Sequence, residues 1–203
     1  AKNADMAGFD GVEIHGANGY LLDQFTRDST NIRDDAYGGS IGNRCRLPLE
    51  VTDAVVDVWG ADRVGYRISP FHPYNDICDS DPGRTFSYLA EELARRNLVY
   101  LHLVELGGNM SGEDFLARRN PLLPRLRKIW PNALITNGGY DRAGADAVID
   151  AGLADLVSFG APYLANPDLP ERLHSGAAHN EPDRATFYGG GAKGYTDYPF
   201  LSD

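Results

Sequence analysis

The chain has few of the residues that mark several common protein classes. Its 203 residues include only two cysteines, Cys45 and Cys78, whose spacing fits neither a disulfide framework nor a zinc site. It carries 19 Lys and Arg against 29 Asp and Glu, without the basic block that binds nucleic acid or anionic membranes. Its apolar runs are too short to span a bilayer. Its first residues lack a charged region followed by an apolar stretch, so we expect no signal peptide. We therefore expect a cytoplasmic protein that binds no metal, nucleic acid or membrane.

The residues that are present are sufficient for one globular domain. The hydrophobic content is 42% and the 23 glycines are dispersed along the chain, which is compatible with a buried core. The first residues resemble the end of a helix that Gly8 terminates. Because Ala1 rather than Met opens the sequence, we expect residues 1–203 to be the C-terminal part of a single domain in a longer protein.

Short apolar segments alternate with segments of helical periodicity along the whole chain. Strands are expected at 12–15, 63–69, 98–105, 133–136 and 155–159, and helices at 47–58, 86–97, 121–130, 141–151 and from 166 onward. A long loop is expected from Gly16 to about Gly39. Alternating strands and helices indicate a parallel sheet.

Two parallel α/β folds compete for this pattern. A doubly wound sheet would place a G-x-G-x-x-G turn after its first strand, and this sequence has none there. A (β/α)8 TIM barrel places functional residues at the C-terminal ends of several strands, where His15, Arg67, Gly138-Gly139 and Gly160 lie. Five strands cannot close an eight-stranded barrel. We therefore predict an α/β fold, an incomplete TIM barrel in which this chain supplies about strands 4–8 and earlier βα units precede it.

The first strand ends in a polar cluster of His15, Asn18 and Tyr20. His15 and Asn18 offer hydrogen-bond donors for an electron-rich oxygen, and Tyr20 carries a phenolic proton. These groups are suited to polarising a carbonyl and delivering a proton near it.

Two further features suggest a ligand with a phosphate. Arg67 lies on the strand face opposite the apolar row, where a buried charge needs a partner. That partner is either a bound anion or ring, or a carboxylate in the barrel mouth. The late strands end in Gly138-Gly139 and Gly160, which favours a phosphate site, although ordinary loop glycines give the same pattern. His102 is expected to be a satisfied core histidine, or else to line the cavity.

Several blocks together resemble the old yellow enzyme family of FMN-dependent ene-reductases, in its bacterial alkene-reductase and plant oxophytodienoate-reductase branches. The resemblance extends over essentially the whole chain, with the blocks in the family's order. The blocks are His-Gly-Ala-Asn-Gly-Tyr-Leu-Leu-Asp-Gln-Phe at 15–25, Tyr-Gly-Gly-Ser at 37–40 with Asn43-Arg44, Arg-Ile-Ser-Pro at 67–70, Ala-Asn-Pro-Asp-Leu at 165–169 and the aromatic, glycine-rich tail at 187–199.

The resemblance implies a reaction in two halves, with NADPH or NADH as electron donor to FMN. The substrate would be a small electron-poor alkene, an α,β-unsaturated carbonyl or nitro compound. His15 and Asn18 would hold its oxygen, hydride would pass from flavin N5 to the β-carbon, and Tyr20 would protonate the α-carbon. Either a monomer or a homodimer is expected.

The resemblance also implies the cofactor contacts. Arg67 would lie beside the flavin pyrimidine edge, and Gly138, Gly139 and Gly160 would hold the phosphate through their backbone. Many relatives carry an arginine after the glycine of the last strand, where this chain has Ala161. The lost contact is worth about 1.5–3 kcal/mol.

Two aromatic residues of the tail complete the implied site. Phe187 and Tyr188 would line the flavin and substrate cavity. Because the chain lacks three strands of the expected barrel, we expect it to bind FMN poorly on its own. The alternatives are a non-catalytic barrel fragment that binds a phosphorylated ligand or a partner chain, and a barrel enzyme that acts on phosphorylated substrates without flavin.

Overall fold

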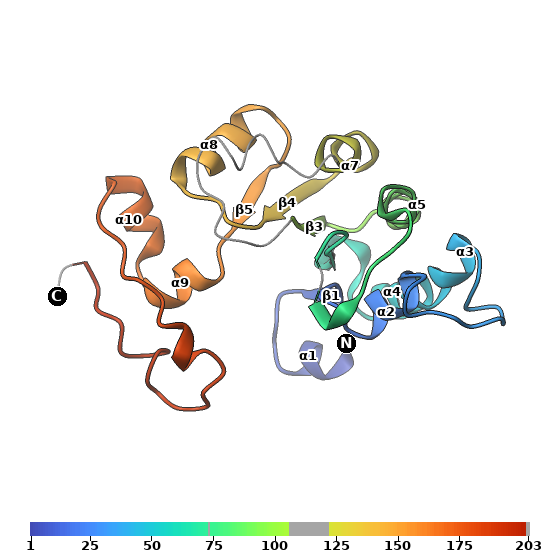
Figure 1. Ribbon diagram of the computed structural model, residues 1–203, viewed down its shortest axis with the longest axis horizontal. Helices are drawn as coiled ribbons and strands as arrows, with labels where there is room; N and C mark the ends of the chain where they lie inside the picture. Colours follow the sequence, from blue (N-terminus) through green and yellow to red (C-terminus); the bar gives the residue numbers. More distant parts are fainter. Residues whose placement is uncertain (73, 106–121, 202–203) are drawn as a thin grey trace. The chain divides into compact units, whose positions relative to one another are not determined.

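The computed structural model describes residues 1–72, 74–105 and 122–201, and it contains one parallel sheet (Figure 1). The strands follow the chain in the order β1-β2-β3-β4-β5, and all five lie within one or two residues of the predicted positions. They are β1 (Val12–Gly16), β2 (Val64–Ile68), β3 (Tyr100–Val104), β4 (Ala133–Asn137) and β5 (Leu156–Ser158). The prediction of a parallel α/β fold is therefore confirmed.

Helices separate the strands, and the chain divides into two compact units, Ala1–Val157 and Ser158–Asp203. The helices of the first unit are α1 (Lys2–Met6), α2 (Leu21–Thr26), α3 (Ile41–Arg44), α4 (Arg46–Trp59), η1 (Ala61–Arg63), η2 (Tyr74–Asp76), α5 (Pro82–Ala94), α7 (Leu123–Ile129) and α8 (Arg142–Asp150). Those of the second unit are α9 (Ala161–Ala165), α10 (Leu169–Ser175) and η3 (Arg184–Thr186).

The register of the sheet separates an apolar face from a polar one. His15 lies opposite Arg67, which lies opposite His102 on the next strand. Because side chains alternate along a strand, this row shares one face and the neighbouring residues share the other. The row on that other face is fully buried, with exposed fractions of 6% or less, and consists of Ile14, Tyr66, Leu101 and Leu134. The core therefore lies on the side opposite His15 and Arg67.

The sequence of helix α5 accounts for both where the helix begins and which of its faces is buried. The side chain of Asp81 accepts a hydrogen bond from the backbone N–H of Arg84, and Pro82 occupies the first turn, as is usual for a helix N-terminus. The predicted stripe of Phe86, Leu89 and Leu93 is buried, as the spacing of three and four residues requires.

Helix α4 is present where it was predicted but buries a different face. The predicted stripe began with Leu47 and Val51, which are half-buried. The fully buried positions are Pro48, Leu49, Thr52 and Trp59. Thr52 is compatible with burial because its hydroxyl donates to the carbonyl of Pro48 at 2.7 Å, which satisfies its polar group inside the helix.

Several short helices were missed, and two of them lie beside residues of the predicted site. Helix α2 lies inside the predicted loop between Gly16 and Gly39, and α9 follows β5 directly. A helix of five or six residues spans fewer than two turns, so it shows no clear apolar period. The helix expected from Asn166 onward begins at Leu169, with Asp168 at its N-cap position.

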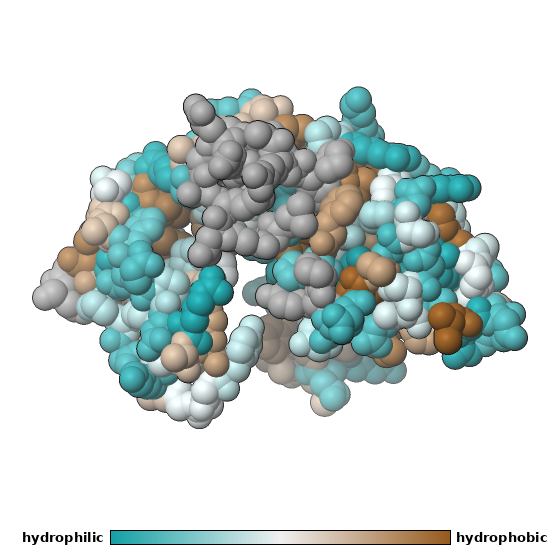
Figure 2. All heavy atoms as spheres, in the orientation of Figure 1, coloured by the Kyte–Doolittle hydropathy of each residue, from teal (hydrophilic) through white to brown (hydrophobic). Residues whose placement is uncertain are grey.

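Among the described residues, no helix is long and apolar enough to cross a bilayer. Figure 2 shows one face, on which hydrophilic residues are interspersed with small apolar patches.

The close packing of β1 on the core side predicts that Gly16→Ala destabilises the fold. A Cβ at Gly16 would overlap the ring and hydroxyl of Tyr66, which is fully buried and has no room to shift. We expect a loss of about 1–3 kcal/mol in the free energy of unfolding, measured by urea titration. The control is Gly83→Ala in α5, where the added Cβ makes only an ordinary contact with Asp81; equal stability of the two variants would contradict the prediction.

Candidate active site

His15 lies near the C-terminal end of β1, on the polar face of the sheet. Its ring centroid is 5.4 Å from that of Tyr20. Partial burial and the positive charge of Arg67 lower the pKa of His15 below its usual value of 6.5. The imidazole is therefore neutral at pH 7, and in that form one ring nitrogen donates a hydrogen bond.

Asn18 occupies a tight turn immediately after β1. Its backbone is left-handed, with φ of 57°, a conformation that Asn tolerates better than most residues. Its N–H donates to the hydroxyl of Ser69 at 2.7 Å. Its side-chain oxygen Oδ1 is buried without a hydrogen-bond partner. Such an atom indicates a place where a ligand or water completes the site.

Tyr20 is placed by helix α2. It is the N-cap residue of that helix, with extended backbone angles, and its side chain is 58% exposed. The position of the phenol therefore depends on how α2 is attached to the sheet.

Arg67 is half-buried on β2, directly opposite His15. Its Nε is buried and has no hydrogen-bond partner, and the ion pairs found among the described residues do not include it. The carboxylate partner that the sequence left open is therefore not observed. A buried donor of a charged group without a partner is costly, so this atom also indicates a ligand.

Glu13 lies two residues before His15 on β1, and its carboxylate pairs with His102 rather than with Arg67. Its Oε2 lies 2.9 Å from Nδ1 of His102. Burial alone would raise the pKa of Glu13, but the hydrogen bond and charge of His102, with the charge of Arg67, lower it below its usual value. His102 is 6% exposed. His102 is therefore buried and hydrogen-bonded as predicted, but it lies on the polar face with His15 and Arg67 rather than in the apolar core.

The glycines after β4 have backbone angles that other residues rarely adopt. Gly138 has φ of 136° and Gly139 has φ of 75°, so this turn requires glycine. In the second unit, Gly160 is the N-cap residue of α9 and Ala161 is its first residue.

The aromatic residues of the tail also lie in the second unit. Phe187 ends the short helix η3. Tyr188 is left-handed, with φ of 59°, and is 95% exposed, so its ring is free of the protein's own core.

The first unit thus brings part of the predicted site together at one end of β1 and β2. The residues that meet there are His15, Asn18, Tyr20 and Arg67. The turn at Gly138 and Gly139 follows β4, two strands beyond β2 in the same sheet. The remaining predicted residues belong to the second unit: Gly160, Ala161, Phe187 and Tyr188.

A buried ion pair beside the site was missed by the sequence reasoning. Asp23 and Arg27 are 0% and 1% exposed, with Arg27 Nε 2.7 Å from Asp23 Oδ1. The signal was an Asp and an Arg four residues apart, the spacing that pairs side chains on one helix face. It was overlooked because the segment was predicted to be a loop.

The part of the chain that is described contains no group of three or more His, Cys, Asp or Glu side chains able to hold a metal ion. The two cysteines differ in environment. Cys78 is exposed, and burial raises the pKa of the Cys45 thiol to about 12, so Cys45 is an inert core thiol.

Comparison with known proteins gives consistent results. Residues 1–180 match the model of the NADH:flavin oxidoreductase / NADH oxidase family. The chain is 52% identical to putative 12-oxophytodienoate reductase 5 of Oryza sativa subsp. japonica, over 100% of this chain and 54% of the relative. It is 49% identical to putative 12-oxophytodienoate reductase 10 of the same organism, over 100% of this chain and 65% of that relative.

Solved structures agree with the sequence relatives. A morphinone reductase structure superposes with a TM-score of 0.89 at 49% identity, over 98% of this chain and 53% of that chain. The old yellow enzyme homologue from Zymomonas mobilis gives a TM-score of 0.91 at 41% identity, over 99% of this chain and 56% of that chain. The chain thus spans little more than half the length of most of these relatives, and its sheet corresponds to part of their TIM barrel. It belongs to the old yellow enzyme family of flavin oxidoreductases.

Proposed function

We propose that this chain is the C-terminal part of an FMN-dependent reductase that uses NADPH or NADH to reduce the C=C bond of α,β-unsaturated carbonyl or nitro compounds. The observation that carries the proposal is the pairing of His15 with Arg67 across β1 and β2, with Asn18 and Tyr20 in the segment that follows. Oxygen-holding groups, a proton source and a cation for the cofactor are thereby gathered at the C-terminal ends of adjacent barrel strands.

The residues present fit FMN in two respects. The unpartnered Nε of Arg67 is a charged donor suited to the acceptor atoms of a flavin ring. The turn at Gly138 and Gly139 has positive φ angles, and backbone N–H groups of such glycine turns are suited to binding a phosphate. Ala161 brings no positive charge to the phosphate, so in this proposal backbone groups hold it. When bound, FMN supplies the hydride that the protein's own side chains do not provide.

His15 and Asn18 bind the oxygen of the substrate. A neutral imidazole and a carboxamide each donate one hydrogen bond, and both remain fixed in the fold while negative charge develops on that oxygen. Donors that are already oriented stabilise the charge without reorganisation, which is the main contribution of an oxyanion-type site. Partial burial and the charge of Arg67 keep the imidazole of His15 neutral by lowering its pKa. His15 therefore binds the substrate oxygen through a hydrogen bond without transferring a proton to it.

Tyr20 donates the proton to the α-carbon. Its ring lies beside that of His15, and its exposed position at the start of α2 allows its proton to be replaced from solvent. Phe187 and Tyr188 belong to the second unit, and their contact with flavin and substrate stays a prediction.

The relatives support the reaction type. Proteins named 12-oxophytodienoate reductase and morphinone reductase support reduction, and a morphinone reductase solved in complex with tetrahydroNAD supports a nicotinamide donor. A monomeric or homodimeric state and a cytoplasmic location stay predictions.

Replacing Tyr20 by Phe tests the proton donor. We expect Tyr20→Phe to slow alkene reduction about 100-fold, while FMN reduction by the nicotinamide is unchanged, because only the alkene needs the phenolic proton. Stopped-flow absorbance of the flavin in the full-length protein follows the two steps separately. The control is Tyr37→Phe, which removes a hydroxyl bonded to Glu50 at the surface; equal loss in both steps for Tyr20→Phe would refute the assignment.

Replacing Arg67 by Lys tests the cofactor contact. Lysine keeps the charge but lacks the planar fork of donors, so we expect the Kd for FMN to rise about 10-fold or more. Fluorescence titration of the full-length protein with FMN measures this. Arg95→Lys, at an exposed pair with Glu92, is the matched control, and an unchanged Kd in Arg67→Lys would exclude Arg67 from the flavin site.

The lowered pKa of His15 predicts a defined pH dependence of stability. Protonation of His15 is more favourable in the unfolded chain, where its pKa is near 6.5, than in the folded one. Its contribution to stability is therefore present above pH 6.5 and is lost as the pH falls through the folded-state pKa. Urea unfolding at a series of pH values should show a steeper acid loss for the wild type than for His15→Asn. Identical slopes would show that His15 is not held neutral by the fold.

A further inference from the structure

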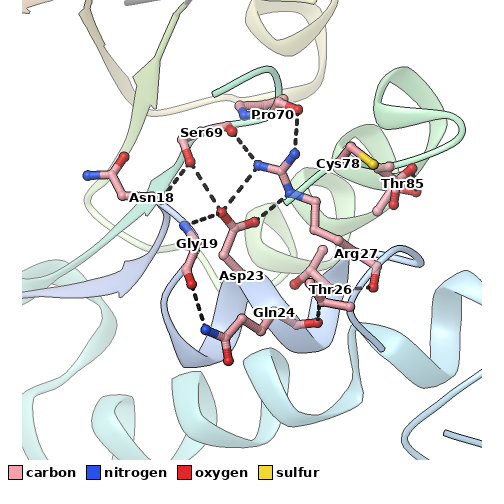
Figure 3. Close-up of polar contacts among 12 residues, drawn as sticks. Asn18, Gly19, Asp23, Gln24, Thr26, Arg27, Ser69, Pro70, Cys78 and Thr85 are labelled. Atoms are coloured by element: carbon pink, nitrogen blue, oxygen red, sulfur yellow. Dashed lines mark hydrogen bonds and ion pairs between the residues drawn. The ribbon is translucent and has the colours of Figure 1, made fainter. Parts of the chain in front are cut away.

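The buried pair of Asp23 and Arg27 makes more contacts than an ion pair on one helix requires. Arg27 Nε donates to Asp23 Oδ1 at 2.7 Å and Nη2 donates to Asp23 Oδ2 at 3.2 Å. The guanidinium also lies 4.9 Å from the ring centroid of Phe86. Figure 3 shows it enclosed between helix α2 and the segment that follows β2.

Arg27 attaches α2 to the end of β2. Its Nη1 donates to the carbonyl of Pro70 at 2.8 Å, and its Nη2 donates to the carbonyl of Ser69. These carbonyls lie two and three residues beyond Arg67. One guanidinium therefore binds both its own helix and the strand that carries the proposed flavin contact.

Asp23 attaches the same helix to the turn that carries Asn18. Its Oδ2 accepts the N–H of Gly19 at 3.0 Å and the hydroxyl of Ser69 at 3.3 Å. The Ser69 oxygen in turn accepts the N–H of Asn18. In Figure 3 the carboxamide of Asn18 points away from this network, so its backbone is held while its side chain stays available.

The energetics argue that this pair does more than stabilise the helix. An Asp–Arg pair four residues apart forms on an exposed helix without leaving water, whereas burying it carries a desolvation penalty of several kcal/mol per ion. The penalty is offset here because the donors of Arg27 and both oxygens of Asp23 are bonded. What burial adds is the set of contacts to Gly19, Ser69 and Pro70.

We propose that Asp23, Arg27 and Ser69 form a positioning clamp that fixes Asn18 and Tyr20 relative to Arg67. Asn18 is held through its backbone N–H, and Tyr20 is held because it begins the helix that the clamp anchors. The clamp residues do not contact the substrate. The catalytic consequence rests on the proposed function, because it concerns the residues that hold and protonate the alkene.

Arg27→Lys tests the clamp with the charge retained. Lysine cannot bind Asp23 in a bidentate manner and reach two carbonyls as well. The matched control is Arg96→Lys. Arg96 also makes a bidentate pair, at 2.6 and 2.9 Å from Asp53, but this pair joins the turn after α5 to α4. In the full-length protein we expect hydrogen exchange of the segment 17–22 to become about 10-fold faster in Arg27→Lys and to be unchanged in Arg96→Lys.

Ser69→Ala tests the same clamp with the ion pair left intact, in case Arg27→Lys does not fold. It removes only the group that joins Asn18 to Asp23. Its control is Ser87→Ala, which deletes another buried hydroxyl, bonded to the carbonyl of Gly83. We expect faster exchange of segment 17–22 in Ser69→Ala alone. We also expect kcat/KM for an α,β-unsaturated ketone to fall about 10-fold, which is the effect expected from losing one hydrogen bond that positions Asn18. The FMN content should be unchanged.

The two measurements separate the clamp from the function. If exchange and kcat/KM of Ser69→Ala match those of Ser87→Ala, the clamp is refuted. If the wild type reduces no electron-poor alkene, the proposed function is wrong, and the exchange result still decides whether the clamp holds Asn18. If Ser69→Ala also lowers the FMN content and the free energy of unfolding, and the loss of bound FMN accounts for the whole fall in kcat/KM, the residues have a general structural role and the proposal is overturned.

Discussion

The site depends on the register in which β1 pairs with β2. That register sets His15 beside Arg67, and it is fixed by the opposite face, where Ile14 and Tyr66 are buried side by side. A slip of one residue would turn the apolar row outward and bury the charged one. The core therefore selects the alignment of the polar residues, although none of its own side chains has a role in the proposed reaction.

A polar face at the end of a sheet must be compensated, and here most of it is. Glu13 pairs with His102, and Asp23 pairs with Arg27. Against this background the unpartnered atoms are informative. Among the described residues of β1, β2 and the turn after β1, the buried polar atoms without a hydrogen-bond partner are the Nε of Arg67, the Oδ1 of Asn18 and, on the core face, the hydroxyl of Tyr66. The Nε of Arg67 is a donor that suits the acceptor atoms of the proposed cofactor, whereas the Oδ1 of Asn18 can only accept a hydrogen bond from a ligand or water.

The sequence predicted what local periodicity and motif spacing determine. The strands and α5 followed from alternation and from a stripe of three- and four-residue spacing, and His15, Asn18 and Tyr20 followed from a family block. It could not predict α2, whose six residues show too little period and whose support comes from residues far along the chain. The sequence also could not predict which of the proposed site residues lie in the same compact unit. Gly160 and Tyr188 belong to the second unit, whereas His15 and Arg67 belong to the first.

The clamp connects these two kinds of information. The blocks at 15–25 and 67–70 were recognised as separate pieces of sequence, yet Asn18 of the first donates to Ser69 of the second across 51 positions. Asp23 belongs to the first block, and Arg27, two residues beyond it, binds the carbonyls that end the second. Residues that flank the proposed reactive side chains of one block, such as Ser69 and Asp23, therefore help to hold the other block in place. A motif of this kind specifies chemistry and its own support together, because a hydrogen-bonding side chain is effective only if its backbone cannot move.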